Sequence, residues 1–472
     1  MNILGNNIGL YTDFYELTMA QGHYVAGHKD DRACFEYYFR ENPFNGGYVI
    51  FAGLWDLIEI LKNYKFSDEA VSYLRSKGFQ AEFLKYLRDF RFQGHIVSMR
   101  EGEVVFPNEP ILRVEGSIIE VQIIETVVLN ILNYSSLIAT KASRISHAAH
   151  GRKIIDFGLR RAPALGSIHG TKAAFIGGVE STSNVFAAQL FDLDVTGTQA
   201  HSWVQCFESE IESFRKFADI YPDHCVLLVD TYDTLASGLP NAVTVAKEME
   251  AKGHKLRGIR IDSGDLEYFS KKARSVLDQA GLNYVKIIAS NMIDEYVIRS
   301  LLEQDAPIDV FGVGTRLITG GESSSLDGVY KMSLFKGTPR FKISDNKSKM
   351  TLPGKKKSVR YVSDDGHFLA DGVLLDTEIS TPEIFHPLYI EKHTRVDHYK
   401  QIDLFVDVMK NGNPIGVSSL KDSIHYARER VEHLPKEHRR FENPHTYKVG
   451  ISSSLMKLRD EFIRDVSSAY HD

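Results

Sequence analysis

Short apolar runs that end in polar clusters recur through the middle of the chain. Each run has the length of a buried strand, and stretches with helical periodicity, such as 240–253 and 265–281, lie between them. The spacing leaves room for one strand and one helix in each interval. This pattern predicts an α/β fold with a parallel β/α barrel, and a doubly wound parallel sheet is the alternative. The runs are 153–161, 195–202, 225–233, 256–265, 285–294 and 308–315.

Polar residues follow most of these predicted strands. In both architectures the carboxyl ends of parallel strands meet at one edge, and ligands bind there. We therefore expect one set of side chains to converge on a single site. The set is Arg160, Thr198, His201, Asp230, Arg260, Asp262, Asn291 and Thr315.

The segment before these runs mixes helices and strands. Asp13 is a predicted helix N-cap, and Glu16 follows three residues later, as in a capping box. Residues 33–39 have strand composition, and 101–117 alternates strand-like runs with Pro and Gly turns. The apolar stretch 118–147 predicts a long buried helix.

After about residue 335 the alternation of strands and helices fades. Residues 341–366 predict a hairpin with a charged turn, and Lys355–Lys357 is expected in a solvated loop. Further on, 404–408 predicts a strand, and 419–434 and 453–466 predict helices.

Composition limits the possible partners. The 472 residues include 56 Lys and Arg against 62 Asp and Glu, a net charge of -6, so no general positive field exists for nucleic acid or an anionic membrane. Three cysteines give no disulfide framework. The first residues lack a basic segment followed by an apolar one, and no apolar run reaches the roughly 20 residues of a membrane helix. A cytoplasmic protein is expected.

Two strand ends have residues suited to binding a ligand. In FGVGT, Gly312 and Gly314 leave room for backbone N–H groups to approach a phosphate, with the Thr315 hydroxyl as a further donor; a plain turn is the alternative. In RIDSGD, Arg260 suits an anion, and the carboxylate pair Asp262 and Asp265 suits ribose hydroxyls or a divalent cation. The alternative there is a structural ion pair followed by a helix cap.

Two other positions have aromatic rings. Phe157, followed by Arg160 and Arg161, offers a flat surface beside a guanidinium and could bind an aromatic anion; a core Phe with surface arginines is equally compatible. His201 could be a nucleophile, a proton carrier or a hydrogen-bonded core residue.

Taken together, these motifs resemble those of the nicotinate phosphoribosyltransferases, in the type II phosphoribosyltransferase family. The matching pieces run in family order along nearly the whole chain. They are TDFYELTMAQGHY, NPFNGGYVIFAGL, FGLRRA, GGVESTSNV, GTQAHSWV, RIDSGDL, ASNMIDE, GVGT, GVYKM and PHTYKVGISSSLMKL. The resemblance implies an N-terminal α/β domain (1–140), a barrel with the active site (141–335) and a C-terminal segment (336–472) that completes the first domain.

The resemblance also implies a reaction. Nicotinate and 5-phosphoribosyl 1-pyrophosphate give nicotinate mononucleotide and pyrophosphate, a step of NAD salvage, with Mg²⁺ as cofactor. ATP hydrolysis is coupled to it through a phosphorylated histidine, which matches His201. A homodimer is implied because Tyr15 matches a tyrosine that stacks on the pyridine ring from the neighbouring subunit.

Further site residues follow from the same resemblance. Phe157 matches the aromatic residue on the other face of the pyridine ring, and Thr198 and Arg260 match nicotinate-site positions. Asp262 matches an acid near the ribose and magnesium. The positions implied to lie near phosphate groups are Arg160, Gly312, Gly314, Thr315 and Lys331.

Ser183 bears on the choice of substrate. Related nicotinamide phosphoribosyltransferases have an aspartate at this position, which would repel a carboxylate, whereas serine can donate a hydrogen bond to nicotinate. We therefore predict nicotinate as the substrate. The alternatives are a nicotinamide or quinolinate phosphoribosyltransferase, or a barrel that binds such ligands without catalysis.

Overall fold

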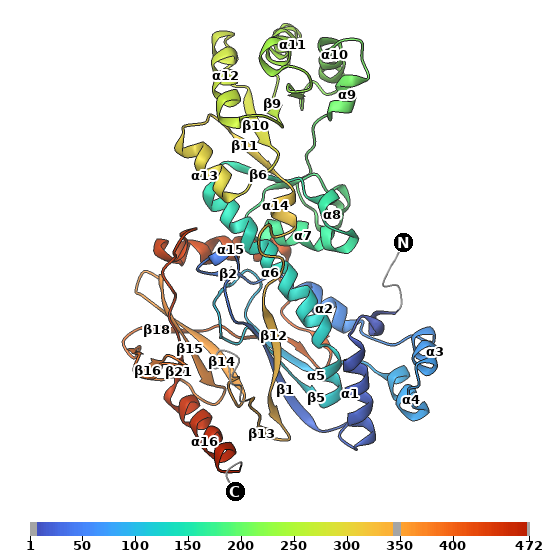
Figure 1. Cartoon of the computed structure of the whole chain (residues 1–472), viewed down its shortest axis with the longest axis vertical. Helices are drawn as coiled ribbons and strands as arrows, with labels where there is room; N and C mark the ends of the chain where they lie inside the picture. The colour runs from blue at the N-terminus through green and yellow to red at the C-terminus, as the bar shows by residue number, and fades with distance from the viewer. Residues whose placement is uncertain (1–6, 343–350, 470–472) are drawn as a thin grey trace. The chain divides into compact units, whose positions relative to one another are not determined.

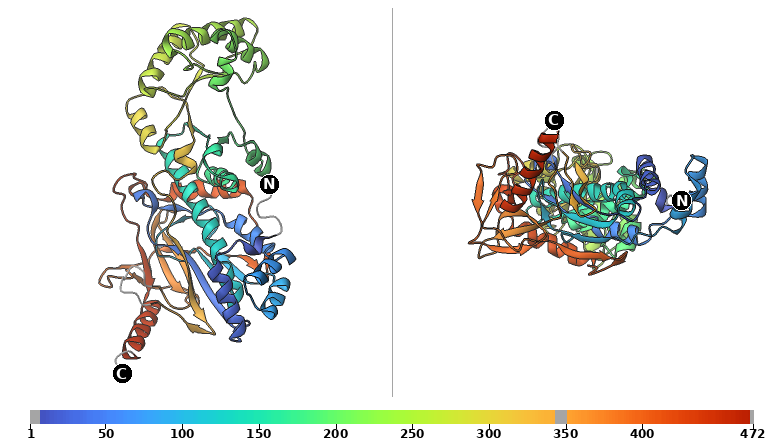
Figure 2. Two further views of the ribbon diagram at one scale, coloured as in Figure 1. Left: turned by 45° about the vertical axis from the view of Figure 1, so that its right-hand side comes forward. Right: turned by 90° about the horizontal axis from the view of Figure 1, so that it is seen from below.

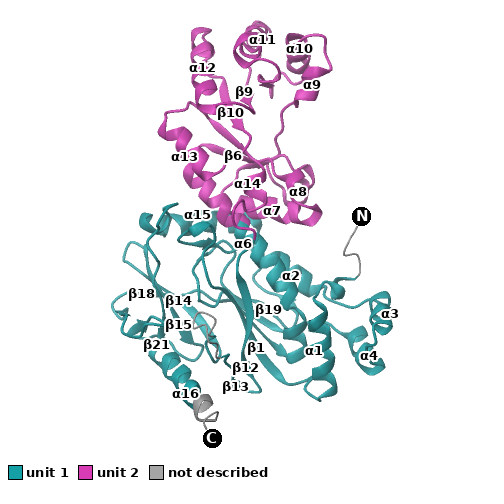
Figure 3. Cartoon of the chain, in the orientation of Figure 1, with its two compact units in different colours: residues 1–137, 325–472 teal, residues 138–324 magenta. Residues whose placement is uncertain are grey.

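The computed structural model describes residues 7–342 and 351–469, with side chains up to residue 464. The chain divides into two compact units (Figure 3). Unit 1 consists of residues 1–137 and 325–472, and unit 2 is the continuous segment 138–324. Two segments far apart in the sequence therefore build one unit.

Unit 2 contains a six-stranded sheet in which every strand pairs in parallel with its neighbour. Its strand order is β7 (Ser181–Thr182), β6 (Lys153–Asp156), β11 (Val310–Val313), β10 (Lys286–Ser290), β9 (Gly258–Ile261) and β8 (Val226–Leu228). The edge strands β7 and β8 do not pair with each other within the described residues, so the sheet is an open half-barrel. The predicted α/β class is confirmed.

Helices follow the strands of this sheet and lie along an arc outside it (Figure 2). They are α7 (Ala164–Ile176), α8 (Val185–Phe191), α9 (His201–Gln205), α10 (Glu210–Ile220), α11 (Leu239–Ala251), α12 (Leu266–Gln279), α13 (Glu295–Glu303) and α14 (Thr315–Ile318). The predicted amphipathic stretches 240–253 and 265–281 correspond to α11 and α12, and Asp265 caps α12 through its side chain.

One predicted strand of unit 2 is wrong. Residues 195–202 form no strand: Val195 makes a single parallel bridge with Thr182, and His201 begins α9. Thr196 and Gly197 have too little apolar surface to add a buried strand, so the bridge is not extended. The sheet instead uses the short strand β7, which the apolar pattern does not reveal because both of its residues are hydroxylated.

Unit 1 is built on two further sheets (Figure 1). The seven-stranded sheet has the order β13 (Thr338–Pro339), β12 (Gly328–Phe335), β1 (Arg32–Phe39), β5 (Leu112–Ser117), β3 (His95–Ser98), β19 (Val406–Lys410) and β20 (Asn413–Pro414). The mixed six-stranded sheet has the order β17 (His393–Arg395), β16 (Glu383–Phe385), β21 (Val449–Ser452), β15 (Phe368–Leu375), β14 (Lys356–Val362) and β18 (Lys400–Asp403). A small pair joins β2 (Val49–Ile50) to β4 (Val104–Val105).

The main core of unit 1 lies between the seven-stranded sheet and its helices. Leu17 of α1, Phe35 of β1, Val114 of β5 and Ile119 of α5 are buried together in it. The helices with residues in unit 1 are α1 (Phe14–Val25), α2 (Leu54–Lys62), α3 (Asp68–Ser76), α4 (Ala81–Asp89), α5 (Ile118–Ile123), α6 (Glu125–Ala148), α15 (Leu420–His433) and α16 (Ser453–Ala469).

Helices α5 and α6 form the long apolar stretch that the sequence predicts as buried. Within the described residues, only Ile118–Ala148 is long and apolar enough to cross a membrane by length and composition, although no such span was expected from the sequence. In the fold, 67% of its most apolar window is buried inside the protein. Burial of this kind is typical of a core helix.

The solvated loop expected at Lys355–Lys357 is wrong. Lys356 begins β14 and is only 2% exposed, and its Nζ lies 2.8 Å from Glu36 Oε2 on β1. A buried carboxylate that pairs with the lysine makes this burial tolerable. The turn of the predicted hairpin, residues 343–350, lies outside the described residues, as do residues 1–6. The strand expected at 404–408 is shifted to β19, Val406–Lys410.

Candidate active site

Arg260, the third residue of β9, links three neighbouring chain segments of unit 2. Its Nη2 donates to Asp262 Oδ1 at 2.8 Å, its Nη1 to Thr198 Oγ1 at 3.1 Å and its Nε to Ser290 Oγ at 2.8 Å. Ser290, the last residue of β10, in turn donates to Asp262 Oδ1 at 2.5 Å. The predicted convergence at the strand ends thus brings Thr198, Arg260 and Asp262 into direct contact.

His201 stands beside this group. Its Nδ1 lies 3.1 Å from Thr231 Oγ1, and its Nε2 lies 3.9 Å from Asp262 Oδ2. The imidazole is 39% exposed, so a ligand can reach it. Asp230, which follows β8, accepts hydrogen bonds from the Asp262 backbone N–H at 2.8 Å and fixes the backbone from which the Asp262 side chain extends.

The ring of Phe157, immediately after β6, lies next to Arg260. The Arg260 Cζ is 5.2 Å from the ring centroid. The guanidinium beside this ring is therefore that of Arg260, and of the two interpretations of Arg160 and Arg161 the structure favours surface arginines. Both follow Phe157 in the short 3₁₀ helix Leu159–Arg161 and are exposed, because that turn carries their side chains away from the buried strand.

The Phe157 ring also explains why residue 312 is a glycine. A Cβ on Gly312 would lie 2.3 Å from Phe157 Cε2, so no side chain fits there while the ring keeps its place. A Cβ on Gly314 would lie 3.1 Å from the Phe157 carbonyl oxygen. Gly312, one of the glycines that suggested a phosphate loop in the sequence, is thus also required for the packing of β11 against Phe157.

The carboxylate of Asp156, the residue before Phe157, organises the ends of β6 and β7. It accepts hydrogen bonds from Gly158 N at 2.7 Å and from the hydroxyls of Thr171 and Thr182, both at 2.8 Å. Burial raises the pKa of Asp156, and these three donors oppose the rise. Ser183 is held at this edge, because its N–H donates to the Asp156 carbonyl oxygen at 2.9 Å.

Other predicted residues stay outside the hydrogen-bonded group. Among the described residues, the side chains of Arg160, Ser183 and Thr315 make no hydrogen bond to Arg260 or Asp262. Thr315 begins α14 and is exposed. Asn291 is exposed, and its φ of 84° lies in the left-handed region that a non-glycine residue seldom adopts.

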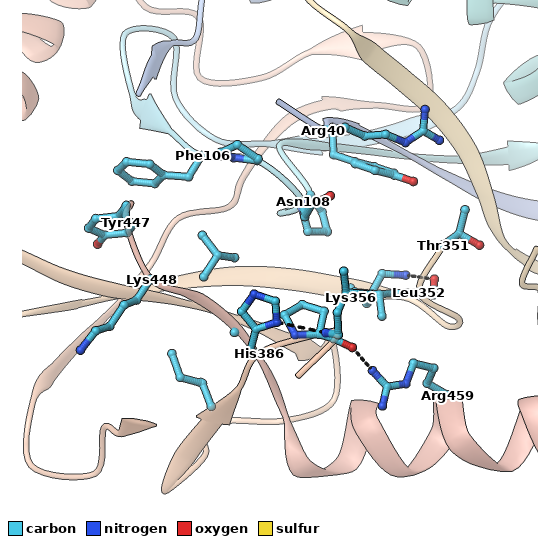
Figure 4. A pocket seen from close by; sticks show the side chains of 18 of the residues that line it. Arg40, Phe106, Asn108, Thr351, Leu352, Lys356, His386, Tyr447, Lys448 and Arg459 are labelled. Carbon is cyan, nitrogen blue, oxygen red and sulfur yellow. Dashed lines mark hydrogen bonds between the residues drawn. The ribbon is translucent and has the colours of Figure 1, made fainter. Parts of the chain in front are cut away.

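Tyr15 and Lys331 belong to unit 1. Tyr15, on the first turn of α1, is 49% exposed. Lys331 Nζ lies 3.6 Å from Glu125 Oε1, and Lys331 lines a cavity of about 850 Å³ within unit 1. Figure 4 shows this cavity, with Arg40 among its labelled residues. Arg40 lines the same cavity, and its buried Nε has no hydrogen-bond partner. Buried donors are nearly always paired, so this nitrogen is suited to an anion.

Sequence reasoning missed Ser290 and Thr231, and it gave Asp230 no role. Asn291 was selected at the end of β10, yet the preceding residue, Ser290, is the one whose side chain contacts Arg260 and Asp262. The alternation of side chains along a strand could have identified Ser290, since Ile288, two residues earlier, pairs with Arg260 itself across the sheet.

No cluster of three or more His, Cys, Asp or Glu side chains with metal-binding geometry occurs in residues 7–342 and 351–469. Asp230 and Asp262 nevertheless follow two neighbouring strands, β8 and β9, and Asp230 accepts from the Asp262 backbone N–H. This donor set suits Mg²⁺ that is held mainly by substrate phosphates, because Mg²⁺ commonly takes only one or two protein carboxylates.

Comparisons with known proteins cover nearly all of the chain. Models of the nicotinate phosphoribosyltransferase N-terminal domain, family and C-terminal domain match residues 10–133, 152–368 and 355–459. The nicotinate phosphoribosyltransferase of Bacillus subtilis is 41% identical over 98% of this chain and 96% of its own length.

Solved structures show the same relation. Human nicotinic acid phosphoribosyltransferase superimposes with a TM-score of 0.85 at 29% identity, over 95% of this chain and 99% of that one. Nicotinate-nucleotide pyrophosphorylase of Pyrococcus furiosus superimposes with a TM-score of 0.72 at 21% identity, over 92% of this chain and 97% of that one. At this identity the likeness shows a shared fold alone. The chain belongs to the nicotinate phosphoribosyltransferase family.

Proposed function

We propose that this enzyme joins nicotinate to 5-phosphoribosyl 1-pyrophosphate, forming nicotinate mononucleotide and releasing pyrophosphate. The observation that carries the proposal is the contact of Arg260 with the Phe157 ring and with Asp262. A planar ring beside a guanidinium suits a pyridine carboxylate, and the neighbouring carboxylate suits a ribose hydroxyl. Thr198, which accepts from Arg260, helps to hold the guanidinium at the ring.

The chemistry requires little beyond positioning and charge. The pyridine nitrogen attacks the anomeric carbon of the ribose, the bond from that carbon to pyrophosphate breaks, and the transition state resembles an oxocarbenium ion. The pyridine nitrogen has no proton to lose, so no general base is needed at that centre. Preorganised charge and alignment of the two reactants supply most of the effect.

We place the phosphate groups at the exposed residues of the same strand ends. Arg160 and Thr315 are exposed and, within the described residues, their side chains have no acceptor or donor that a phosphate would have to displace. Backbone N–H groups near Gly312 and Gly314 add donors. In unit 1, we place a further phosphate contact at the cavity that Lys331 and Arg40 line. Mg²⁺ neutralises pyrophosphate when it is bound, with Asp262 nearby.

We further propose that His201 couples ATP hydrolysis to the reaction. Its contact with Thr231 can hold a proton on Nδ1 and leave a lone pair on Nε2. Nε2 attacks the γ-phosphorus of ATP, the bond to the β-phosphate oxygen breaks, and ADP leaves; water later takes the phosphoryl group as phosphate. The dianion on the imidazole would order Arg260 and tighten substrate binding.

A homodimer is proposed because each unit exposes an apolar surface. On α1, Phe14 is 57% exposed beside Tyr15, and on α8, Val185, Phe186 and Leu190 are all more than half exposed. Large exposed apolar patches mark interaction sites, and a second copy of the chain would cover both. We propose a cytoplasmic location, which suits three unpaired cysteines.

Product analysis tests the function directly. The purified full-length chain is incubated with nicotinate, 5-phosphoribosyl 1-pyrophosphate and Mg²⁺, with and without ATP, and with nicotinamide or quinolinate as alternative acceptors. Nicotinate mononucleotide and equimolar pyrophosphate are expected, with more product when ATP is present. Comparable turnover of nicotinamide, or binding of nicotinate without turnover, would contradict the proposal.

A further inference from the structure

Residues 195–200, which we call the crossing segment, connect the two edge strands of the unit 2 sheet. Figure 1 shows the segment in green, between α8 and α9. At one end, Val195 makes its bridge with Thr182 of the edge strand β7. At the other end, His201 contacts the hydroxyl of Thr231, which follows the opposite edge strand, β8. The segment therefore links both edges of the half-barrel.

The crossing segment is held loosely between these ends. In the part of the chain that the structure describes, the backbone N–H groups of residues 197–200 donate to no backbone carbonyl. Gly197 and Ala200 are exposed, and a Cβ on Gly197 would meet nothing within 4 Å. A segment with so few backbone hydrogen bonds changes its arrangement at low cost. Because the Thr198 hydroxyl accepts from Arg260 Nη1, any such change alters the surroundings of Arg260.

Gln199 is the buried residue of the crossing segment, and it is only 5% exposed. Its amide offers a donor, Nε2, and an acceptor, Oε1, and both atoms are buried without a hydrogen-bond partner among the described residues. Gln122 in unit 1 is as deeply buried, at 6% exposed, yet its Nε2 donates to Glu16 Oε2 at 2.6 Å. A buried polar group without a partner keeps the full cost of its lost hydration. The Gln199 amide therefore destabilises this arrangement of the segment that leads from Thr198 to His201.

We propose that Gln199 is a positioning residue that lets the crossing segment shift when 5-phosphoribosyl 1-pyrophosphate binds. The inference rests on the proposed function, in which this substrate occupies the strand ends beside Arg260. In the substrate-free arrangement the Gln199 amide is unpaired. In the loaded arrangement it is hydrogen-bonded, and Thr198 and His201 move with it. A ligand shifts an equilibrium only by its differential affinity for the two states, and the unpaired amide makes the substrate-free state easier to leave.

Gln199→Met tests the inference, because methionine has a similar length and no amide. Its Tm should be about 2 °C or more above that of the wild type, since an unpaired amide is replaced by an apolar side chain. The KM for 5-phosphoribosyl 1-pyrophosphate should rise about 10-fold, because the variant cannot form the hydrogen bonds of the loaded arrangement. The value of kcat should change less than about twofold.

Gln122→Met is the matched control, at a buried glutamine whose amide is paired. It should lower the Tm, because the Glu16 carboxyl loses its donor, and it should leave the KM in place. The combination of Tm and KM also separates the inference from a packing role for Gln199. A Gln199→Met protein with a lower Tm would show that the amide is paired in the free protein, and a higher Tm with an unchanged KM would show that the amide takes no part in binding. Either result overturns the inference.

A fluorescent label on the crossing segment reports the shift without turnover. Gly197→Cys places a thiol at an open position, in a Cys206→Ser background whose remaining cysteines, Cys34 and Cys225, are buried. The emission of an environment-sensitive label should change when Mg²⁺ and 5-phosphoribosyl 1-pyrophosphate are added, at about 10-fold higher substrate when Gln199→Met is present. An emission that does not respond to saturating substrate would overturn the inference. If no product forms from nicotinate, the proposed function fails, while the Tm comparison and this titration still decide the inference.

Discussion

Arg260 and Asp262 form an ion pair, 2.8 Å from Nη2 to Oδ1, although only one residue separates them at the end of β9. Ser290 holds both side chains, because its hydroxyl accepts from Arg260 and donates to Asp262. The pair is therefore a fixed unit with a cationic end at the Phe157 ring and an anionic end near His201. A ligand with a carboxylate at one end and hydroxyls at the other matches this polarity.

Replacement of Arg260 by lysine should impair nicotinate binding. Lysine keeps the charge but cannot make the three hydrogen bonds of the guanidinium, so we expect kcat/KM for nicotinate to fall about 10- to 100-fold. Steady-state kinetics measure the change. Arg257→Lys, at an arginine whose Nε donates to the Asp223 carbonyl oxygen, serves as the control and should change kcat/KM little. Equal effects of the two variants would argue against a role for Arg260 in binding.

Loss of His201 should uncouple ATP from synthesis. His201→Ala is expected to retain ATP-independent product formation, to lose its stimulation by ATP and to incorporate no acid-labile phosphate from γ-labelled ATP. Retention of labelling would assign the phosphate to another residue. His254→Ala, at a histidine paired with Asp223, is the matched control and should behave as the wild type.

Ser183→Asp should weaken nicotinate. A carboxylate at the end of β7 would repel the carboxylate of the substrate, so the KM for nicotinate should rise by about 10-fold or more. Ser183→Ala removes the hydroxyl without adding charge and should raise KM by less than about 5-fold. If the two variants raise KM equally, charge at position 183 does not determine the choice of substrate.

Stability in acid should depend on a buried network in unit 1. Arg360 is fully buried and contacts Glu103 and Asp371, each at 2.6 Å. Burial alone would raise the pKa of Glu103, but Arg360 and Arg430 outweigh it and hold the pKa below its ordinary value. The stabilisation is therefore complete above the unfolded pKa and is lost as pH falls through the folded one.

Glu103→Gln tests this linkage. The variant should lose about 3 kcal/mol of unfolding free energy at pH 7, because Arg360 is left with one buried carboxylate, that of Asp371. Its Tm should fall less than that of the wild type between pH 6 and pH 3, since it has no charge at this position to lose. Parallel Tm curves for the two proteins would contradict the assigned role. Thermal denaturation followed by circular dichroism gives both curves.

The spacing of apolar residues along the chain and the composition of each run were enough to predict the α/β class and most strands of unit 2. They could not separate β7 from its surroundings, because Ser181 and Thr182 have no apolar signature. They also misplaced Lys356, since a charged residue next to two other lysines resembles a loop. Only the three-dimensional partner, Glu36, makes its burial possible, and that partner is 320 positions away.

The candidate site was predicted in outline because parallel strands bring their carboxyl ends together. Arg260 and Asp262 are in contact at the end of β9, as the strand-end rule requires, whereas Thr198, which follows no strand, also contacts Arg260. Which arginine faces Phe157 depends on how the chain turns after β6, and sequence spacing does not determine that. The need for glycine at position 312 also depends on the rotamer of Phe157, which the sequence does not determine.

The discontinuity of unit 1 has a consequence for synthesis on the ribosome. Strand β1 pairs with β12, and Glu36 pairs with Lys356. Because β12 and Lys356 follow unit 2 in the sequence, β1 and Glu36 cannot complete these contacts until unit 2 has been synthesised. At 5–20 residues per second, the intervening 320 positions take roughly 15 to 60 s. During that time, the edge of β1 that pairs with β12 and the carboxylate of Glu36 lack their native partners. Unit 2, by contrast, is translated without interruption and can fold first.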